Sequence, residues 1–236
     1  MKICQINQPA GIGDIFFTQK IAAHYVDRYY KVIWPVRKDF LWLNDYLISP
    51  GVLYTNPDAQ IMVNDSVVQP DVVLELQTAD QVYPDKKLME CKYELAGLDY
   101  TDWTYYFNFK RNTDKENSLF YDILNLTDTE EYAFVSKFVG TPPEGTNLAG
   151  DIKKDINVNT KLRVVELDYV VGYNVLDWCK VLENASEIYM VDTVFNYILE
   201  KLNLKATTKH LYSRYTPADF SHIEKLWKVN WKYIKT

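Results

Sequence analysis

The first fourteen residues constrain the fold of this chain most strongly. They read MKICQINQPAGIGD, an apolar run typical of a buried strand that ends in a glycine turn, and residues 15–29 follow with the spacing of a helix. Gly11 and Gly13 allow a tight turn and a close approach of the backbone to a ligand. This order predicts the opening of a nucleotide- or sugar-handling α/β domain, with Asp14 at the mouth of the crevice beyond the strand.

Asp14 has two interpretations at this turn. Its carboxylate either caps the helix or faces a bound hydroxyl and takes its proton. The dinucleotide fingerprint requires a third glycine where the chain has Phe16, and the P-loop requires a lysine where it has Asp14. Neither standard phosphate cradle is therefore present.

Composition bounds the remaining possibilities. With 236 residues, 47% of them hydrophobic, the chain can bury one large core or two smaller ones. A net charge of −6 argues against a general nucleic-acid binder. Three scattered cysteines and three scattered histidines predict no metal site and fit a reducing compartment. No apolar run approaches the roughly 18 residues of a membrane span, so we expect a cytoplasmic protein without a transmembrane segment.

Two series of alternating strands and helices predict two Rossmann-like α/β domains that face a cleft. We expect an N-terminal domain over residues 1–128 and a C-terminal domain over 129–215. Residues 216–236 carry an apolar stripe with helical spacing and are predicted to form a helix that crosses back onto the N-terminal domain. Ligands of such proteins bind at the carboxyl ends of the strands.

Two short motifs resemble the GT-B glycosyltransferases, in particular their heptosyltransferase-like branch. The first is the turn and helix start with Gly13, Asp14 and Thr18. The second is the helix, strand and helix of residues 183–203, in which the strand ends at Asp192 and Thr193. The order of elements over most of the chain is similar to that family, in a compact form.

The resemblance implies a hexosyl- or heptosyltransferase-like enzyme. Such an enzyme transfers a sugar from a nucleotide-diphosphate sugar to a hydroxyl of a glycan or other acceptor, with inversion and without a metal or further cofactor. Asp14 would be the catalytic base. The backbone N–H groups that follow Asp192, together with the Thr193 hydroxyl, would hold the donor diphosphate.

Further residues are candidates for the same site, each with a structural alternative. Guanidinium and ammonium groups could clamp phosphates, a carboxylate could accept a ribose hydroxyl, and aromatic rings could stack on a sugar. For the charged candidates a solvated surface is the commoner role, and for the aromatic ones packing between the halves is the commoner role. The donor-binding set is Gly11, Gly13, Lys137, Asp192, Thr193, Glu200 and Arg214, and the possible phosphate or sugar contacts are Arg111, Trp103 and Tyr106.

A non-catalytic glycan- or nucleotide-binding protein of the same fold is the alternative function. The heptosyltransferase pattern has a glycine and a histidine after the strand-end aspartate, where this chain has Val194 and Asn196. A dinucleotide-dependent oxidoreductase is a weaker third possibility, because the third glycine is missing and no acid closes the second strand. The sequence leaves open the donor, the acceptor and the oligomeric state.

Overall fold

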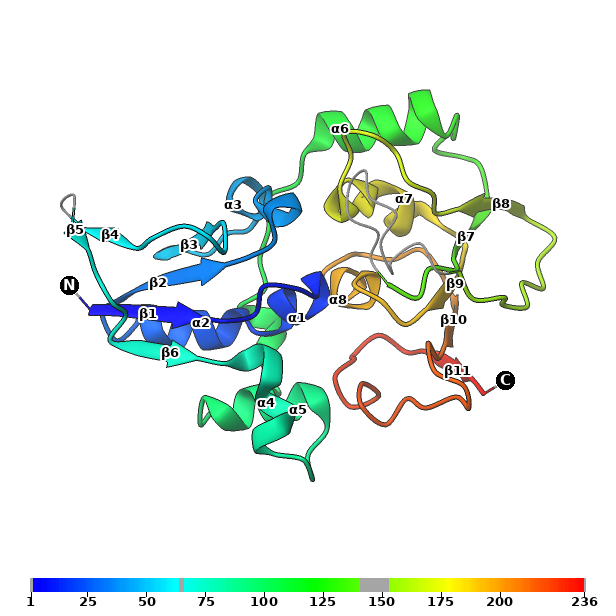
Figure 1. Cartoon of the computed structure of the whole chain (residues 1–236). Coiled ribbons are helices and arrows are strands. Elements are labelled where there is room, and N and C mark those ends of the chain that lie inside the picture. Colours follow the sequence, from blue (N-terminus) through cyan, green and yellow to red (C-terminus); the bar gives the residue numbers. More distant parts are fainter. Residues whose placement is uncertain (1, 64–65, 141–152, 236) are drawn as a thin grey trace. The chain divides into compact units, whose positions relative to one another are not determined.

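The computed structural model describes residues 2–63, 66–140 and 153–235. It divides the chain into two compact units, Met1–Lys110 and Arg111–Thr236, which we call unit 1 and unit 2. Each unit is built around its own parallel β-sheet and carries helices (Figure 1). The prediction of two α/β halves is therefore confirmed.

Unit 1 contains a four-stranded parallel sheet in the order β3-β2-β1-β6. Val32, Ile33 and Trp34 of β2 are all buried, as expected for an inner strand of a parallel sheet that is covered on both faces. The strands are β1 (Lys2–Ile6), β2 (Tyr30–Pro35), β3 (Val52–Thr55) and β6 (Val72–Leu74), with the antiparallel pair β4 (Met62–Val63) and β5 (Ser66–Val67) between β3 and β6.

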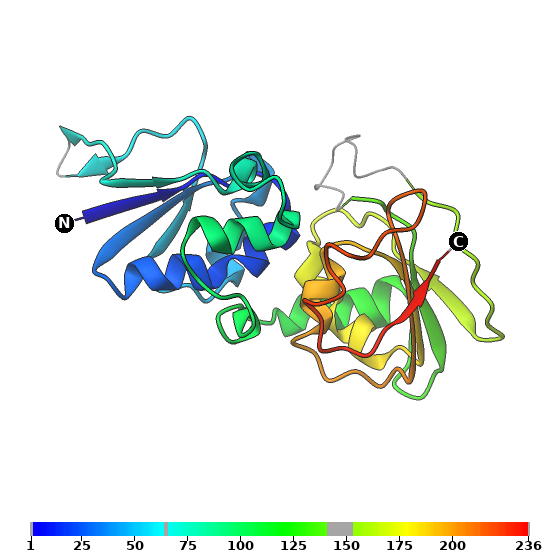
Figure 2. The ribbon, with the colours of Figure 1, turned by 90° about the horizontal axis from the view of Figure 1, so that it is seen from below.

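Short helices complete unit 1. Helix α2 lies along one face of the sheet (Figure 2). The ring of Phe17 at the end of α1 lies 4.9 Å from that of Tyr93 in α5, which joins these two helices. The helices are α1 (Ile12–Phe17), α2 (Gln19–Val26), α3 (Leu43–Tyr46), α4 (Ala79–Val82) and α5 (Leu88–Leu95), with 3-10 turns η1 (Lys38–Phe40), η2 (Leu76–Thr78) and η3 (Trp103–Tyr105).

Unit 2 contains a five-stranded parallel sheet in the order β11-β10-β9-β7-β8. In chain order this is 2-1-3-4-5, a common arrangement of doubly wound α/β proteins. The strands are β7 (Tyr132–Ser136), β8 (Arg163–Glu166), β9 (Glu187–Val191), β10 (Thr208–Tyr212) and β11 (Lys232–Ile234).

Different parts of unit 2 cover the two faces of its sheet. On one face Phe134 packs its ring against Trp178 and Phe195, which belong to helical segments. On the other face a cluster that includes Val135 and Tyr189 packs against the irregular segment around Ile156. The helical segments are α6 (Thr113–Asn117), the π-helical η4 (Ser118–Ile123), η6 (Val175–Trp178), α7 (Cys179–Asn184) and α8 (Phe195–Leu199).

The structure divides the chain at Lys110 rather than at residue 128, where the sequence suggested a boundary. The segment that follows Lys110 is tied into unit 2 by side chains. Arg111 forms an ion pair with Glu183 at 2.9 Å, and Lys180 donates a hydrogen bond to Asn117 at 2.8 Å. The helical pattern of residues 113–126 gives no indication of which sheet it covers, so the sequence could not assign it.

The prediction of a helix over residues 216–236 is wrong. The described part of this tail consists of turns followed by β11, which pairs with β10 and completes the sheet of unit 2. Side-chain oxygens accept the backbone N–H groups that a helix would use, since Ser213 Oγ binds the Asp219 N–H and the Glu200 carboxylate binds those of Lys228 and Val229. Such contacts compete with helix formation.

Candidate functional site

In the sheet of unit 1, β2 and β3 are added on one side of β1 and β6 on the other, so the strand order reverses between β1 and β6. Polar side chains gather at the carboxyl ends of these two strands. Crevices at such switch points are the usual ligand sites of open α/β sheets. Asp14 lies in the first turn of α1, which follows β1. Gly11 precedes this helix with a φ of 80°, and a Cβ there would collide with the Asp14 carboxylate, so the turn requires glycine.

A buried lysine, Lys92 of α5, organises this end of unit 1. Its side chain is 1% exposed. Its ammonium group donates hydrogen bonds to Gln8 Oε1 at 2.5 Å and to the Leu76 carbonyl at 2.9 Å, and it forms an ion pair with Asp14 Oδ1 at 3.2 Å. An ammonium group has three protons to donate. Lys92 is therefore held by two hydrogen bonds and one ion pair, and its charge lies beside one oxygen of the Asp14 carboxylate.

The structure excludes one of the two interpretations of Asp14, the helix cap. Gly11 is the N-cap of α1, no side chain caps that helix, and Gly13 lies inside the helix. The capping interpretation of Asp14 is therefore wrong, and its carboxylate is instead paired with Lys92. The side chain remains 27% exposed, so a ligand can reach it.

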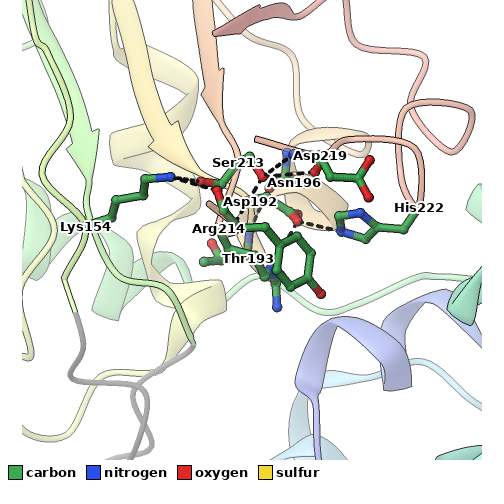
Figure 3. A network of polar contacts seen from close by, with 9 residues as sticks. Lys154, Asp192, Thr193, Asn196, Ser213, Arg214, Asp219 and His222 are labelled. Atoms are coloured by element: carbon green, nitrogen blue, oxygen red, sulfur yellow. Dashed lines mark hydrogen bonds and ion pairs between the residues drawn. The ribbon is translucent and has the colours of Figure 1, made fainter. Parts of the chain in front are cut away.

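In unit 2 the corresponding switch point lies between β7 and β9. Asp192 directly follows β9, and its carboxylate is 1% exposed. Two groups contact its Oδ2 atom, Arg214 Nε at 3.1 Å and His222 Nε2 at 3.1 Å (Figure 3). Arg214 follows β10, while His222 comes from the tail. Three separate segments thus meet at one buried carboxylate.

Charge is concentrated in this cluster. Burial disfavours the charge of Arg214, but the carboxylate of Asp192 outweighs it and raises the pKa of the guanidinium. Lys154 adds a second cation, because its ammonium group donates to the carbonyl groups of Ser213 at 2.8 Å and Tyr215 at 3.1 Å (Figure 3). Asp219, whose main chain is bound by Ser213 Oγ, adds a second carboxylate, so the two cations and the two carboxylates of the cluster balance.

Four buried side-chain atoms of this region have no hydrogen-bond partner among the described residues. Buried polar atoms are nearly always paired, and each unpaired one costs about 1–3 kcal/mol. All four groups can donate a hydrogen bond, and the amide nitrogen can only donate. They are Ser136 Oγ at the end of β7, Thr193 Oγ1, Asn196 Nδ2 and His222 Nδ1.

The predicted phosphate contact at the start of α8 has a different geometry. The helix begins at Phe195 and spans only five residues, and the Thr193 N–H already donates to Asn196 Oδ1 at 3.0 Å. That N–H is therefore not available to a ligand. Asp192 is not a helix cap, because it is bound by Arg214 and His222. The side chains of Thr193 and Asn196 offer further donors at this position.

The other predicted polar residues of unit 2 have partners away from this cluster. Lys137 binds Glu166 at 2.8 Å, which lowers the pKa of that carboxyl group. Burial raises the pKa of Glu200, although it accepts hydrogen bonds from two backbone N–H groups of the tail. Arg111 is held by Glu116 and Glu183. The structure therefore joins only Asp192, Thr193 and Arg214 of the predicted donor set at one place.

The aromatic candidates lie in unit 1. Trp103 is 1% exposed, and its ring contacts those of Phe17 and Phe107, so the structure places it in the core rather than on an open surface. A buried ring cannot stack on a sugar, and the prediction for Trp103 is corrected accordingly. Tyr106 is half-buried and has the ammonium group of Lys20 over its ring at 5.8 Å.

Sequence reasoning missed two residues that organise these sites, Lys92 and His222. Lys92 occupies a position in α5 where a lysine usually reaches solvent, and no local pattern distinguishes a buried one. His222 falls in the tail that was predicted as a helix. Polar residues come directly after β7, β9 and β10. This pattern is the signal that could have located the sheet edge at which His222 contacts Asp192.

The described part of the chain contains neither a candidate metal site nor a candidate membrane span. Within residues 2–63, 66–140 and 153–235, no three His, Cys, Asp or Glu side chains are grouped so as to hold a metal ion. In the same ranges, every helix is too short or too polar to cross a bilayer.

No model of a protein family and no curated protein sequence matches the chain. Two solved structures are similar to it. The iron-containing dodecameric glycosyltransferase TibC from enterotoxigenic E. coli H10407 has a TM-score of 0.48 and 9% identity, over 90% of this chain and 59% of TibC. A glycosyl transferase family 9 protein from Veillonella parvula has a TM-score of 0.47 and 8% identity, over 99% of this chain and 86% of that one. Scores this low assign neither a fold family nor a function.

Proposed function

We propose that this chain is a glycosyltransferase that binds a nucleotide-diphosphate sugar at the carboxyl end of the unit 2 sheet. The observation that carries the proposal is the set of unpartnered donors beside Arg214. Ser136, Thr193 and Asn196 supply donors that lack an acceptor among the described residues, and His222 Nδ1, which donates when the ring is protonated, also has no partner there. A ligand rich in acceptor oxygens and carrying negative charge, such as a diphosphate, has the matching chemistry.

Two cations at this end of the sheet support an anionic ligand. Arg214 is paired with the buried Asp192, whereas Lys154 is bound by two carbonyl groups and not by a carboxylate. A guanidinium group can bind two phosphate oxygens at once. Because these groups are partly or fully buried, their attraction for a phosphate is weakly screened by salt.

The proposed reaction moves a glycosyl group between two oxygens. The acceptor hydroxyl oxygen attacks the anomeric carbon, the bond from that carbon to the diphosphate oxygen breaks, and the configuration inverts. The hydroxyl proton passes to a general base, the role that the sequence predicts for Asp14, and the nucleoside diphosphate leaves with the electron pair. Arg214 and the donors of unit 2 stabilise the negative charge that develops on the diphosphate, so the step needs no metal ion.

A non-catalytic nucleotide- or glycan-binding protein is the second candidate. The pairing of Asp14 with Lys92 favours it, because a carboxylate held by a buried ammonium group is engaged before any substrate arrives. Both candidates share the donor site in unit 2. They differ only in whether bound donor is turned over.

Binding of nucleotides tests the proposal directly. We expect one class of nucleoside diphosphate, from a panel with different bases, to raise the melting temperature of the protein, because a ligand of the native state stabilises it. Replacing Arg214 with alanine should weaken that binding by about 1.5–3 kcal/mol, the range for hydrogen bonds to a charged group. Isothermal titration calorimetry measures the difference.

Arg163→Ala is the matched control. Arg163 lies at the start of β8, at the opposite end of the same sheet, and pairs with Glu130 at 3.0 Å. Its loss should leave nucleotide affinity unchanged. Equal affinity of wild type and Arg214→Ala would remove this arginine from the site, and an absence of binding across the panel would overturn the proposed function.

A further inference from the structure

His222 is the residue of the unit 2 cluster with the most unusual bonding. Its Nε2 atom lies 3.1 Å from Asp192 Oδ2, while its Nδ1 atom is buried and has no partner among the described residues. The imidazole belongs to the tail after β10, a region far in sequence from the strand that carries Asp192. It is 15% exposed, so it lies at the border between the protein interior and solvent.

The bond to Asp192 decides which nitrogen carries the proton. An ionised carboxylate only accepts hydrogen bonds, so Nε2 must be the donor. Neutral His222 then presents a lone pair at Nδ1, whereas the protonated ring presents a second N–H. Neither form finds a partner for Nδ1 in the described residues, but the protonated form would donate to an anion.

The surroundings restrict which groups can respond to pH. Around the imidazole are Asp192, which directly follows β9, Arg214, which follows β10, and the ring of Tyr215, 5.2 Å away and nearly perpendicular. Lys154 and Asp219 lie one hydrogen bond further out. Between pH 6 and 8 carboxylate, guanidinium, ammonium and phenol groups ordinarily stay in one protonation state, whereas an imidazole ordinarily changes between two.

We infer that the donor site of unit 2 takes up a proton on His222 when it binds a diphosphate. The inference rests on the proposed function, and it adds that ligand binding is coupled to the uptake of a proton. The anion favours the imidazolium form, and Asp192 holds the ring in place through Nε2 while Nδ1–H donates to a phosphate oxygen. By linkage, affinity rises as pH falls through the range in which the imidazole gains its proton.

The test uses ligands whose own charge is constant. In UDP-glucose, GDP-mannose and ADP-glucose both phosphates are esterified, so these probes lack the terminal phosphate group that titrates near neutrality. We expect the probe that binds to do so about fivefold more tightly at pH 6 than at pH 8. At pH 7, calorimetry in two buffers of different ionisation enthalpy should reveal uptake of a fraction of a proton per ligand.

His222→Gln separates the imidazole from the rest of the site. The glutamine amide can still donate to Asp192, so the variant should fold, and its affinity for the probe should be the same at pH 6 and at pH 8. His210→Gln is the matched control, because His210 lies within β10 and contacts the ring of Tyr189 at 4.7 Å. The control should keep the full pH dependence.

The outcomes distinguish this inference from the function on which it rests. If none of the three probes binds at any pH, the donor site and the inference both fail. Binding with no proton uptake and equal affinity at pH 6 and 8 overturns the inference alone. The same holds if His222→Gln keeps the pH dependence of wild type. The wild-type buffer measurement stands even where the variant does not fold.

Discussion

The two switch points of this molecule differ in how completely their polar groups are bonded. In unit 1 the ammonium group of Lys92 has two hydrogen-bond acceptors and an ion-pair partner, and no buried side-chain nitrogen or oxygen among the described residues of that unit lacks a partner. In unit 2 the carboxylate of Asp192 is paired, but donors of Thr193 and Asn196 are left without acceptors, and His222 Nδ1 without a partner, in the described structure. A buried charge therefore anchors both sites, and only one of them is complete.

This difference has an energetic meaning. A satisfied network fixes its members in one geometry, whereas each buried group without a partner costs about 1–3 kcal/mol. A chain that leaves several donors unpaired at one sheet edge gives up stability there that an acceptor ligand would restore. We therefore interpret unit 1 as holding a preorganised carboxylate and unit 2 as holding a site built for an anion.

The largest expected effect tests whether the satisfied site of unit 1 does chemistry. Asp14→Asn removes the base but keeps an oxygen that can accept from Lys92. Because a general base contributes about a hundredfold to ten-thousandfold, turnover of an identified donor and acceptor should fall by that factor. Steady-state kinetics measures the loss, and calorimetry should find donor affinity unchanged.

Wild-type turnover in Asp14→Asn would make the pair with Lys92 purely structural and favour the non-catalytic alternative. A thermal melt shows whether the variant is folded. If Asp14→Asn unfolds, Asp14→Ser supplies a second variant that removes the carboxylate and shortens the side chain.

The next prediction concerns the stability that Lys92 supplies. Replacing Lys92 with methionine keeps the apolar stem but leaves Gln8 Oε1 without the lysine donor, removes one of two donors to the Leu76 carbonyl and deprives Asp14 of its ion-pair partner. We expect a loss of about 2–4 kcal/mol in the free energy of unfolding, since buried groups would be left unpaired. Urea denaturation followed by circular dichroism measures it.

Lys86→Met is the control for this substitution. Lys86 pairs with Glu94 at 3.3 Å, and both side chains are about half exposed. Exposed ion pairs contribute about 0–1 kcal/mol, so the control should change stability little. Equal losses in the two variants would contradict the view that the buried network holds unit 1 together.

Periodicity in the sequence was sufficient to predict most of the sheet framework. The apolar runs around Cys4, Ile33 and Met190 lie in strands β1, β2 and β9, because a strand buried in a parallel sheet must be apolar along its length. The glycine turn before Asp14 was also predicted, and Gly11 has the positive φ that this turn needs.

Long-range pairing was not predictable from the same patterns. Ile223, Leu226 and Trp231 are buried, as their apolar stripe implied, but in turns of unit 2 rather than on a helix. Which acceptor an N–H finds depends on side chains such as Ser213 that lie elsewhere in the sequence. The partners of Lys92 and His222 follow from the fold in the same way, so no local motif could identify them.

The smallest expected effect compares the two sites most directly, because each contains one fully or almost fully buried threonine. Thr18 Oγ1 donates to the Asp14 carbonyl at 2.8 Å, whereas Thr193 Oγ1 has no partner among the described residues. Replacing threonine with valine exchanges the hydroxyl for a methyl group of similar size. Thr18→Val should therefore lower the free energy of unfolding by about 1 kcal/mol, while Thr193→Val should leave it unchanged or raise it.

Ligand binding should respond in the opposite sense. Thr193→Val removes a donor that only a ligand would satisfy, so nucleotide affinity should fall by about 0.5–1.5 kcal/mol in calorimetry, and Thr18→Val should leave it unchanged. If Thr193→Val destabilised the free protein as much as Thr18→Val does, its hydroxyl would already be bonded in solution. The contrast between a complete and an incomplete site would then fail at the residue where it is most easily measured.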